Sequence, residues 1–123
     1  YGIGTDIVSV DRIKKSIKSK HLLNRLFHKK EISKCSGLLS QYNCYAKRFA
    51  AKEAFSKALG TGIANGINFN EIIILNEKKG KPFIKLEGVT KKFIKKKFKN
   101  ELKIFLSISD EKEYAIAFVA ISI

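Results

Sequence analysis

The 123-residue sequence has one proline, two cysteines, no methionine and no tryptophan. Cys35 and Cys44 have neither C-x-x-C spacing nor a nearby pair of histidines, so no zinc site is expected. Two cysteines also cannot form the disulfide framework of a small secreted domain, and we expect both to be reduced packing residues in a cytoplasmic protein. No apolar run approaches the length of a membrane span, and the opening residues do not resemble a signal peptide.

Acidic residues are scarce as well: 11 Asp and Glu stand against 25 Lys and Arg, which gives a formal net charge of +14. Such a charge favours an anionic partner, such as nucleic acid, a phosphorylated ligand or an acidic protein. Lysine is densest between Lys78 and Lys99. Arginine, which phosphate recognition usually prefers, is rare, and no aromatic-interleaved RNA-binding motif is present. Charge alone leaves open both a nucleic-acid-binding module and a solvated, lysine-rich surface.

The length and a hydrophobic share of 45% indicate a single globular domain over residues 1–123. The apolar pattern predicts a strand at 1–10, helices at 12–36 and 38–59, a hairpin at 71–86, a helix at 89–99 and a second hairpin at 102–123. Asp11 is the expected cap of the first helix, and Gly60 the expected end of the long one. Val89 is expected to face inward. This order predicts an α+β fold with antiparallel pairing.

The predicted last strand is apolar on both faces. One face carries Tyr114, Ile116 and Phe118, and the other carries alanines, Val119 and Ile121. A strand in so small a domain is buried on both faces only if something covers the second one. A second subunit could provide that cover.

Two carboxylates fall where apolar side chains are expected. Glu53 shares a helical stripe with Phe49, and Asp6 interrupts the apolar first strand on the face of Val8. A buried carboxylate is unfavourable unless it is paired or bound to a metal. Two carboxylates from separate elements suit Mg²⁺, which takes one or two carboxylates together with substrate phosphates. The alternatives are an ion pair of Glu53 with Lys57 and a local turn at Asp6.

The segment from Lys57 to Gly62 is not a Walker A loop, because its lysine precedes the glycines. A helix C-terminus has the wrong dipole for a phosphate, so an anion here would be held by Lys57, Arg48 or loop amides. His21 and His28 have no serine or cysteine partner at a recognisable spacing, and we expect both to be surface residues.

The stretch from Arg48 to Gly62, RFAAKEAFSKALGTG, resembles the signature of holo-[acyl-carrier-protein] synthase, the short bacterial type of 4′-phosphopantetheinyl transferase. Residues 2–8 resemble the first strand of that family, residues 69–82 its middle hairpin and residues 106–115 its last one. The resemblance implies an antiparallel sheet wrapped around a long central helix. It also implies a homotrimer with active sites at the subunit interfaces.

The implied activity is transfer of 4′-phosphopantetheine from coenzyme A to a serine of apo-acyl carrier protein, with release of adenosine 3′,5′-bisphosphate, in support of fatty acid biosynthesis. In the family, the residues that match Asp6 and Glu53 bind Mg²⁺. Together with Lys57 they are the expected catalytic residues. The implied partners are coenzyme A and the acidic carrier protein, and neither nucleic acid nor a membrane is expected.

Further positions match the contacts of the family with its substrates. Those that match coenzyme A contacts are Arg48, Lys57, Gly60, Thr61 and Pro82. Two arginines, Arg12 and Arg25, match residues on which the carrier protein docks.

The sequence departs from the family at two positions. Many members have histidines where this chain has Phe105 and Asp110, so no role of those histidines transfers. The acceptor of the serine proton stays open between a metal-ordered water and a carboxylate such as Glu53. The departure also keeps open a catalytically inactive protein that binds coenzyme A or carrier protein as a scaffold.

Overall fold

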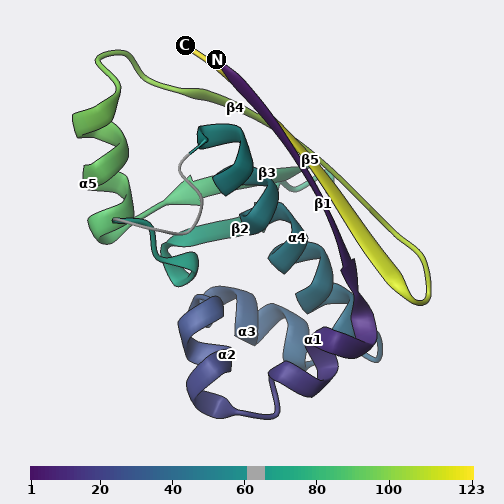
Figure 1. Ribbon diagram of the computed structural model, residues 1–123. Coiled ribbons are helices and arrows are strands. Elements are labelled where there is room, and N and C mark those ends of the chain that lie inside the picture. The colour runs from purple at the N-terminus through teal and green to yellow at the C-terminus, as the bar shows by residue number, and fades with distance from the viewer. Residues whose placement is uncertain (61–65) are drawn as a thin grey trace.

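The computed structural model describes residues 1–60 and 66–123 (Figure 1). The elements in chain order are β1 (Gly2–Ser9), α1 (Val10–Ser16), α2 (Lys20–Leu26), α3 (Lys29–Ser36), α4 (Gln41–Leu59), the 3₁₀ turn η1 (Phe69–Glu71), β2 (Ile72–Asn76), β3 (Pro82–Leu86), α5 (Gly88–Lys97), β4 (Lys103–Asp110) and β5 (Tyr114–Ser122). This order confirms the α+β class, both hairpins and the long helix that ends at Gly60. In the described part of the chain, no helix is long and apolar enough to cross a membrane.

The strands form two antiparallel sheets rather than one. β1, β5 and β4 make a three-stranded sheet in that order, and β2 pairs with β3. α4 packs against β1 and β5, while α5 and the β2–β3 hairpin lie on the other side of α4 (Figure 1). Helices α1 to α3 gather at one end of the molecule, away from the two termini (Figure 1).

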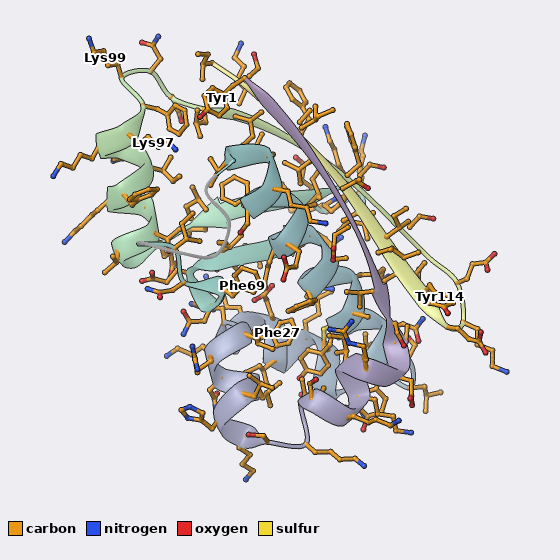
Figure 2. All side chains as sticks on the ribbon, viewed as in Figure 1. Tyr1, Phe27, Phe69, Lys97, Lys99 and Tyr114 are labelled. Carbon is orange, nitrogen blue, oxygen red and sulfur yellow. A yellow bond between two sulfur atoms is a disulfide. The ribbon has the colours of Figure 1, made fainter. Side chains whose placement is uncertain are left out.

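The core lies around α4. Phe27 packs against Tyr45 with ring centroids 4.9 Å apart, and Phe49 packs against Phe69 at 5.7 Å. Figure 2 shows Phe27 and Phe69 in the interior, whereas Lys99 projects outward beyond the end of α5. The lysines from 78 to 99 are all exposed, which fits both alternatives that the composition left open.

The last strand has the two faces that the sequence predicted. Its inner face, with Ala117, Val119 and Ile121, is buried against α4. On its outer face Ile116 and Phe118 are each 45% exposed, so this apolar surface is uncovered in the single chain. An exposed apolar patch of this kind is typical of an interaction surface.

β1 crosses α4 at a very short distance. A Cβ on Gly4 would overlap the carbonyl oxygen of Ala54 and lie 2.7 Å from the backbone nitrogen of Ala58. A Cβ on Gly2 would overlap the carbonyl oxygen of Ala58. Glycine on the strand and alanine on the helix therefore let the two backbones touch. This contact brings Asp6, on the same face of β1 as Gly4, next to α4.

We expect Gly4→Ala to lower the free energy of unfolding by about 3 kcal/mol, because backbone atoms, unlike side chains, cannot move aside for the new methyl group. Gly37→Ala is the matched control, since a Cβ there meets nothing within 4 Å and the backbone has a negative φ of −87°. Urea denaturation of both variants measures the difference. Equal stability of the two would contradict the close contact between β1 and α4.

Two local expectations were wrong. The side chain of Ser9, not Asp11, caps α1 by accepting from the backbone nitrogen of Arg12 at 3.4 Å, while Asp11 pairs with Lys15 at 3.0 Å. Val89 is 56% exposed, because the first turn of α5 is held by its backbone rather than by that side chain.

His28 is not a free surface residue either. It caps α3: its Nδ1 accepts from the backbone nitrogen of Lys30 at 3.1 Å, and its own backbone nitrogen donates to Glu31 at 2.9 Å. Its Nε2 lies 3.3 Å from Glu87. The ring therefore has a structural role as a helix cap. That role explains the presence of a histidine that has no nucleophile partner.

The carboxylate of Glu71 organises the start of α5. Its oxygens accept from the backbone nitrogens of Val89 at 3.0 Å and Thr90 at 3.1 Å, from the Thr90 hydroxyl at 2.9 Å and from Asn68 at 2.9 Å. These donors include N–H groups that the helix itself cannot satisfy. Burial raises the pKa of Glu71, but the hydrogen bonds from Asn68 and Thr90 outweigh it and hold the pKa below its usual value.

Glu71 should make stability depend on acid pH. Because the pKa is lower in the folded chain, the stabilisation is fully present above the unfolded pKa of about 4.3 and is lost as pH falls through the folded pKa. We expect Glu71→Gln to reduce this acid-dependent loss by about 1 kcal/mol, measured by thermal unfolding between about pH 3 and pH 7. The exposed Glu77→Gln is the control. Parallel pH curves for wild type and Glu71→Gln would contradict this role.

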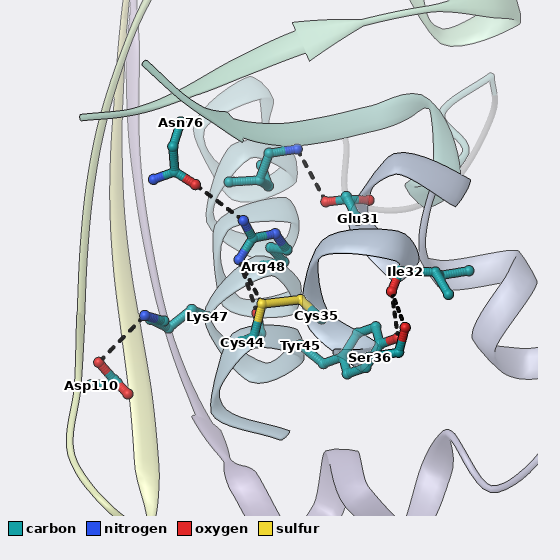
Figure 3. The surroundings of a disulfide bond; sticks show 11 residues. Glu31, Ile32, Cys35, Ser36, Cys44, Tyr45, Lys47, Arg48, Asn76 and Asp110 are labelled. Atoms are coloured by element: carbon teal, nitrogen blue, oxygen red, sulfur yellow. Dashed lines mark hydrogen bonds and ion pairs between the residues drawn. A yellow bond between two sulfur atoms is a disulfide. The ribbon is translucent and has the colours of Figure 1, made fainter. Parts of the chain in front are cut away.

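The expectation of two reduced cysteines was also wrong. Cys35 and Cys44 form a disulfide, with their Cα atoms 5.4 Å apart, between the end of α3 and the first turn of α4 (Figure 3). The tight connection between two packed helices brings the sulfurs together, which motif spacing along the chain does not reveal.

Candidate functional site

The contact between β1 and α4 brings Asp6, Glu53 and Lys57 together. The Lys57 ammonium lies 3.2 Å from Asp6 Oδ1 and donates to the carbonyl oxygen of Thr5 at 3.0 Å. Glu53 lies one turn before Lys57 on α4 and is close enough to both Asp6 and Lys57 for their charges to shift its pKa. Among the described residues, the ion-pair partner of Lys57 is thus the strand carboxylate of Asp6 rather than its helix neighbour Glu53.

The electrostatics of this cluster are those of two crowded carboxylates. Burial, and then the charge of Asp6, raise the pKa of Glu53, while Lys57 and Arg12 oppose that rise. Asp6 is mostly buried, and within residues 1–60 and 66–123 its Oδ2 has no hydrogen-bond partner. A buried carboxylate oxygen without a partner is unfavourable and calls for a cation or a donor.

This arrangement fits a magnesium ion held in part by its substrate. In the described residues, no group of three or more His, Cys, Asp or Glu could hold a metal ion. Two carboxylates on different elements, one with an unpartnered oxygen, are nevertheless the protein ligands that Mg²⁺ commonly uses, with waters and phosphates completing the shell.

A small hollow lies where α1 and α2 meet α4. It has a volume of about 210 Å³, and its walls include Val8 from β1, Arg12 from α1 and Phe49 from α4. Arg12 is exposed at its rim, and Arg25 is exposed on α2. Both predicted docking arginines therefore lie in the helical end of the molecule that contains the start of α4 (Figure 1).

Arg48 does not join this cluster. It precedes Lys57 by nine positions, and at about 100° per residue that places it on the opposite face of α4. Arg48 is only 5% exposed, and its guanidinium donates to the carbonyl oxygen of Cys44 at 3.3 Å and to Asn76 Oδ1 at 3.1 Å (Figure 3). Burial lowers the pKa of Arg48, and its Nε is buried without a partner among the described residues.

The other predicted coenzyme A residues are spread along the chain. Gly60 ends α4 with φ of +79°, and Pro82 begins β3. Thr61 lies outside the described residues.

The two positions that replace family histidines have different surroundings. Phe105 is 57% exposed on the outer face of β4. Asp110 accepts from Asn43 at 3.1 Å and lies 3.8 Å from Lys47, so it holds the end of β4 to the first half of α4 (Figure 3).

The buried ion pair between Lys52 and Glu31 was not predicted from the sequence. Lys52 is fully buried and donates to Glu31 at 2.7 Å and to the carbonyl oxygens of Phe69 at 2.7 Å and Ile72 at 2.5 Å. Burial lowers the pKa of Lys52 to about 8, against the opposing effect of Glu31. The signal was available: Lys52 follows Tyr45 by seven positions and precedes Phe55 by three, a spacing typical of a core stripe.

Known proteins match the chain over nearly its whole length. The family model described as the 4′-phosphopantetheinyl transferase superfamily matches residues 2–119. The chain belongs to this superfamily. It is 47% identical to the holo-[acyl-carrier-protein] synthase of Pelagibacter ubique over 119 residues, which cover 96% of this chain and 93% of that protein.

Solved structures agree with the sequence relatives. The chain is similar to the crystal structure of holo-[acyl-carrier-protein] synthase from Neisseria meningitidis, with a TM-score of 0.88 and 37% identity over 99% of this chain and 98% of that chain. It is also similar to the Helicobacter pylori synthase in complex with coenzyme A, with a TM-score of 0.81 and 34% identity over 98% of this chain and 99% of that one. The resemblance of the sequence to the holo-[acyl-carrier-protein] synthase family is confirmed.

Proposed function

We propose that this chain, as a single domain over residues 1–123, is a holo-[acyl-carrier-protein] synthase. It would transfer 4′-phosphopantetheine from coenzyme A to a serine of apo-acyl carrier protein and release adenosine 3′,5′-bisphosphate, serving fatty acid biosynthesis in a cytoplasm. The observation that carries the proposal is the cluster of Asp6, Glu53 and Lys57 in a chain whose family match spans residues 2–119. The similar Helicobacter pylori synthase binds coenzyme A, which supports the choice of donor.

Asp6 and Glu53 are the residues that would hold Mg²⁺, which, when bound, neutralises charge on the diphosphate of coenzyme A. The Lys57 side chain is 53% exposed, so its ammonium can leave Asp6 and contact a phosphate oxygen as charge develops on the leaving group. The serine hydroxyl needs a proton acceptor, and both Glu53 and a water ordered beside it remain candidates.

A coenzyme A site that uses both Lys57 and Arg48 needs more than one copy of the chain, because the two side chains lie on opposite faces of α4. Coenzyme A carries a 3′-phosphate as well as a diphosphate, so two separate cationic groups have targets. The uncovered apolar face of the three-stranded sheet, which includes Ile7, Phe105 and Phe118, offers the contact surface. We therefore propose a homotrimer with its sheet wrapped around α4 and active sites at subunit interfaces, where Arg48, Gly60, Thr61 and Pro82 contact coenzyme A.

Arg12 and Arg25 are proposed to dock the acidic carrier protein. Both are exposed, and Arg12 is near enough to Glu53 for its charge to oppose the rise that burial causes in the pKa of that carboxyl. Complementary charge would speed the encounter and lose its effect as salt rises. In this proposal the net charge of +14 attracts an acidic protein partner and has no role toward nucleic acid or a membrane.

Release of adenosine 3′,5′-bisphosphate tests the proposal. We expect product from coenzyme A and Mg²⁺ when apo-carrier protein is present, and none when holo-carrier protein replaces it or when EDTA is added. Coenzyme A binding without product, tried with several carrier proteins, would favour the scaffold alternative. Tight, steeply salt-dependent binding of nucleic acid without coenzyme A binding would favour the nucleic-acid-binding module.

A further inference from the structure

A continuous chain of contacts runs from the disulfide to the β2–β3 hairpin (Figure 3). The bond between Cys35 and Cys44 joins the end of α3 to the first turn of α4. One turn further, Arg48 Nη1 donates to the Cys44 carbonyl oxygen at 3.3 Å and to its sulfur at 3.2 Å. Arg48 Nη2 donates to Asn76 Oδ1 at 3.1 Å, and Asn76 Nδ2 donates to the carbonyl oxygen of Gly80 at 2.9 Å. Two side chains therefore connect the disulfide to the hairpin turn.

Arg48 depends on these contacts for its orientation. Its guanidinium is buried, and a buried charge is unfavourable unless its donors have fixed acceptors. Both acceptors of the Nη1 hydrogen bonds belong to Cys44, a residue held in place by its bond to α3. The Nε of Arg48 is also buried and has no partner within the described residues, so the fold leaves one donor of the guanidinium unsatisfied.

The sulfur atoms have no spare room. Cys35 is fully buried and Cys44 is 4% exposed. Two thiols need more space than a bonded sulfur pair, so reduction would move the first turn of α4 relative to α3. The carbonyl oxygen and sulfur of Cys44 would move with that turn, and with them both acceptors of Arg48 Nη1.

We propose that the Cys35–Cys44 disulfide positions Arg48 and the hairpin turn after Asn76, so that thiol–disulfide exchange at this pair sets the affinity for coenzyme A. The inference rests on the proposed function, which gives Arg48 and Pro82 their ligand. In the exchange, an external dithiol passes two electrons and two protons to the Cys35–Cys44 pair and itself becomes a disulfide. The Cys35–Cys44 bond breaks, and both cysteines become thiols.

Kinetics of the oxidised and the dithiothreitol-reduced protein distinguish a disulfide that positions Arg48 from one that only stabilises the fold. We expect reduction to raise KM for coenzyme A about tenfold with kcat within about twofold, the size of effect that displaced hydrogen bonds to a charged group produce. Reoxidation with oxidised glutathione should restore KM. Alkylation followed by mass measurement defines the redox state of each sample. A disulfide that only stabilised the fold would change the melting temperature and leave KM unchanged.

The double variant Cys35→Ser/Cys44→Ser is the matched control, because the chain has no other cysteine. It should show the raised KM and no response to reductant. Asn76→Ala should raise KM in the oxidised protein, since it removes the link between Arg48 and the turn. Lys47→Ala, next to Arg48 but paired with Asp110, should leave KM unchanged.

The outcomes separate this inference from the proposed function. No transfer in either redox state would count against the proposed function, and calorimetry with adenosine 3′,5′-bisphosphate would then decide the inference through the ratio of the two affinities. Transfer with equal KM in both states would overturn the inference and leave the proposed function standing. Cysteines that alkylate fully without reduction and resist oxidation by glutathione would also overturn it.

Discussion

Asp6→Asn is expected to lower the rate of phosphopantetheine transfer by at least about 100-fold while the fold stays intact. The carboxylate has one oxygen 3.2 Å from Lys57 and a second, buried oxygen without a partner among the described residues. The amide has nearly the same shape but no charge to hold a cation. Because the substitution removes a poorly compensated buried charge, the melting temperature should stay the same or rise.

The control for Asp6→Asn is Asp11→Asn, which removes an equal charge from an exposed position paired with Lys15. It should change kcat/KM by no more than about twofold. The rates are measured from the release of adenosine 3′,5′-bisphosphate at saturating carrier protein. Near wild-type activity of Asp6→Asn would remove Asp6 from the metal site.

Glu31→Gln is expected to lower the free energy of unfolding by about 3–5 kcal/mol, the largest stability effect that we predict for a single substitution. It leaves the Lys52 ammonium fully buried without its counter-charge. It also weakens the acceptor of the backbone nitrogens of His28 at 2.9 Å and Ile74 at 3.1 Å. One carboxylate thus joins α3, α4 and β2, and its loss should loosen all three.

The double variant Glu31→Gln/Lys52→Met distinguishes the charge from the packing. Removing the second charge should recover a large part of the lost stability, whereas independent effects would add. Chemical denaturation measures both variants, with the exposed Glu111→Gln as a control within about 0.5 kcal/mol of wild type. A single variant as stable as the control would contradict the importance of this pair.

The carboxylates of the candidate site could be found in the sequence because they break its apolar pattern. Asp6 and Glu53 stand where the strand and the helix should bury apolar side chains, and such exceptions have few physical explanations. The end of the long helix at Gly60 was equally predictable, since its φ of +79° is a conformation that glycine adopts without strain.

Other features depended on contacts between elements that are distant in sequence. Ser9 and Asp11 can both cap a helix, and the choice follows from the backbone nitrogen of Val10, which still pairs with Glu113 at 2.9 Å as a continuation of the β1–β5 ladder. The disulfide required the packing of α3 on α4. Neither could be read from spacing alone.

Arg48 and Lys52 lie between these cases. Their periodicity places them on a buried stripe of α4, so burial was predictable from the sequence. Their partners were not, because Asn76 and Glu31 come from elements whose position relative to α4 is fixed only by the fold. Motif reasoning assigned Arg48 to the same ligand as Lys57, whereas the helix puts them on opposite faces.

Intact mass of apo-acyl carrier protein tests the central claim most directly. The carrier protein is incubated with this chain, coenzyme A and Mg²⁺, with and without EDTA, and with the Asp6→Asn variant in a parallel sample. We predict a mass gain of one 4′-phosphopantetheine on the carrier protein, absent with EDTA and with the variant. No gain with any of several carrier proteins, despite measurable coenzyme A binding, would contradict the assignment of this chain as a transferase.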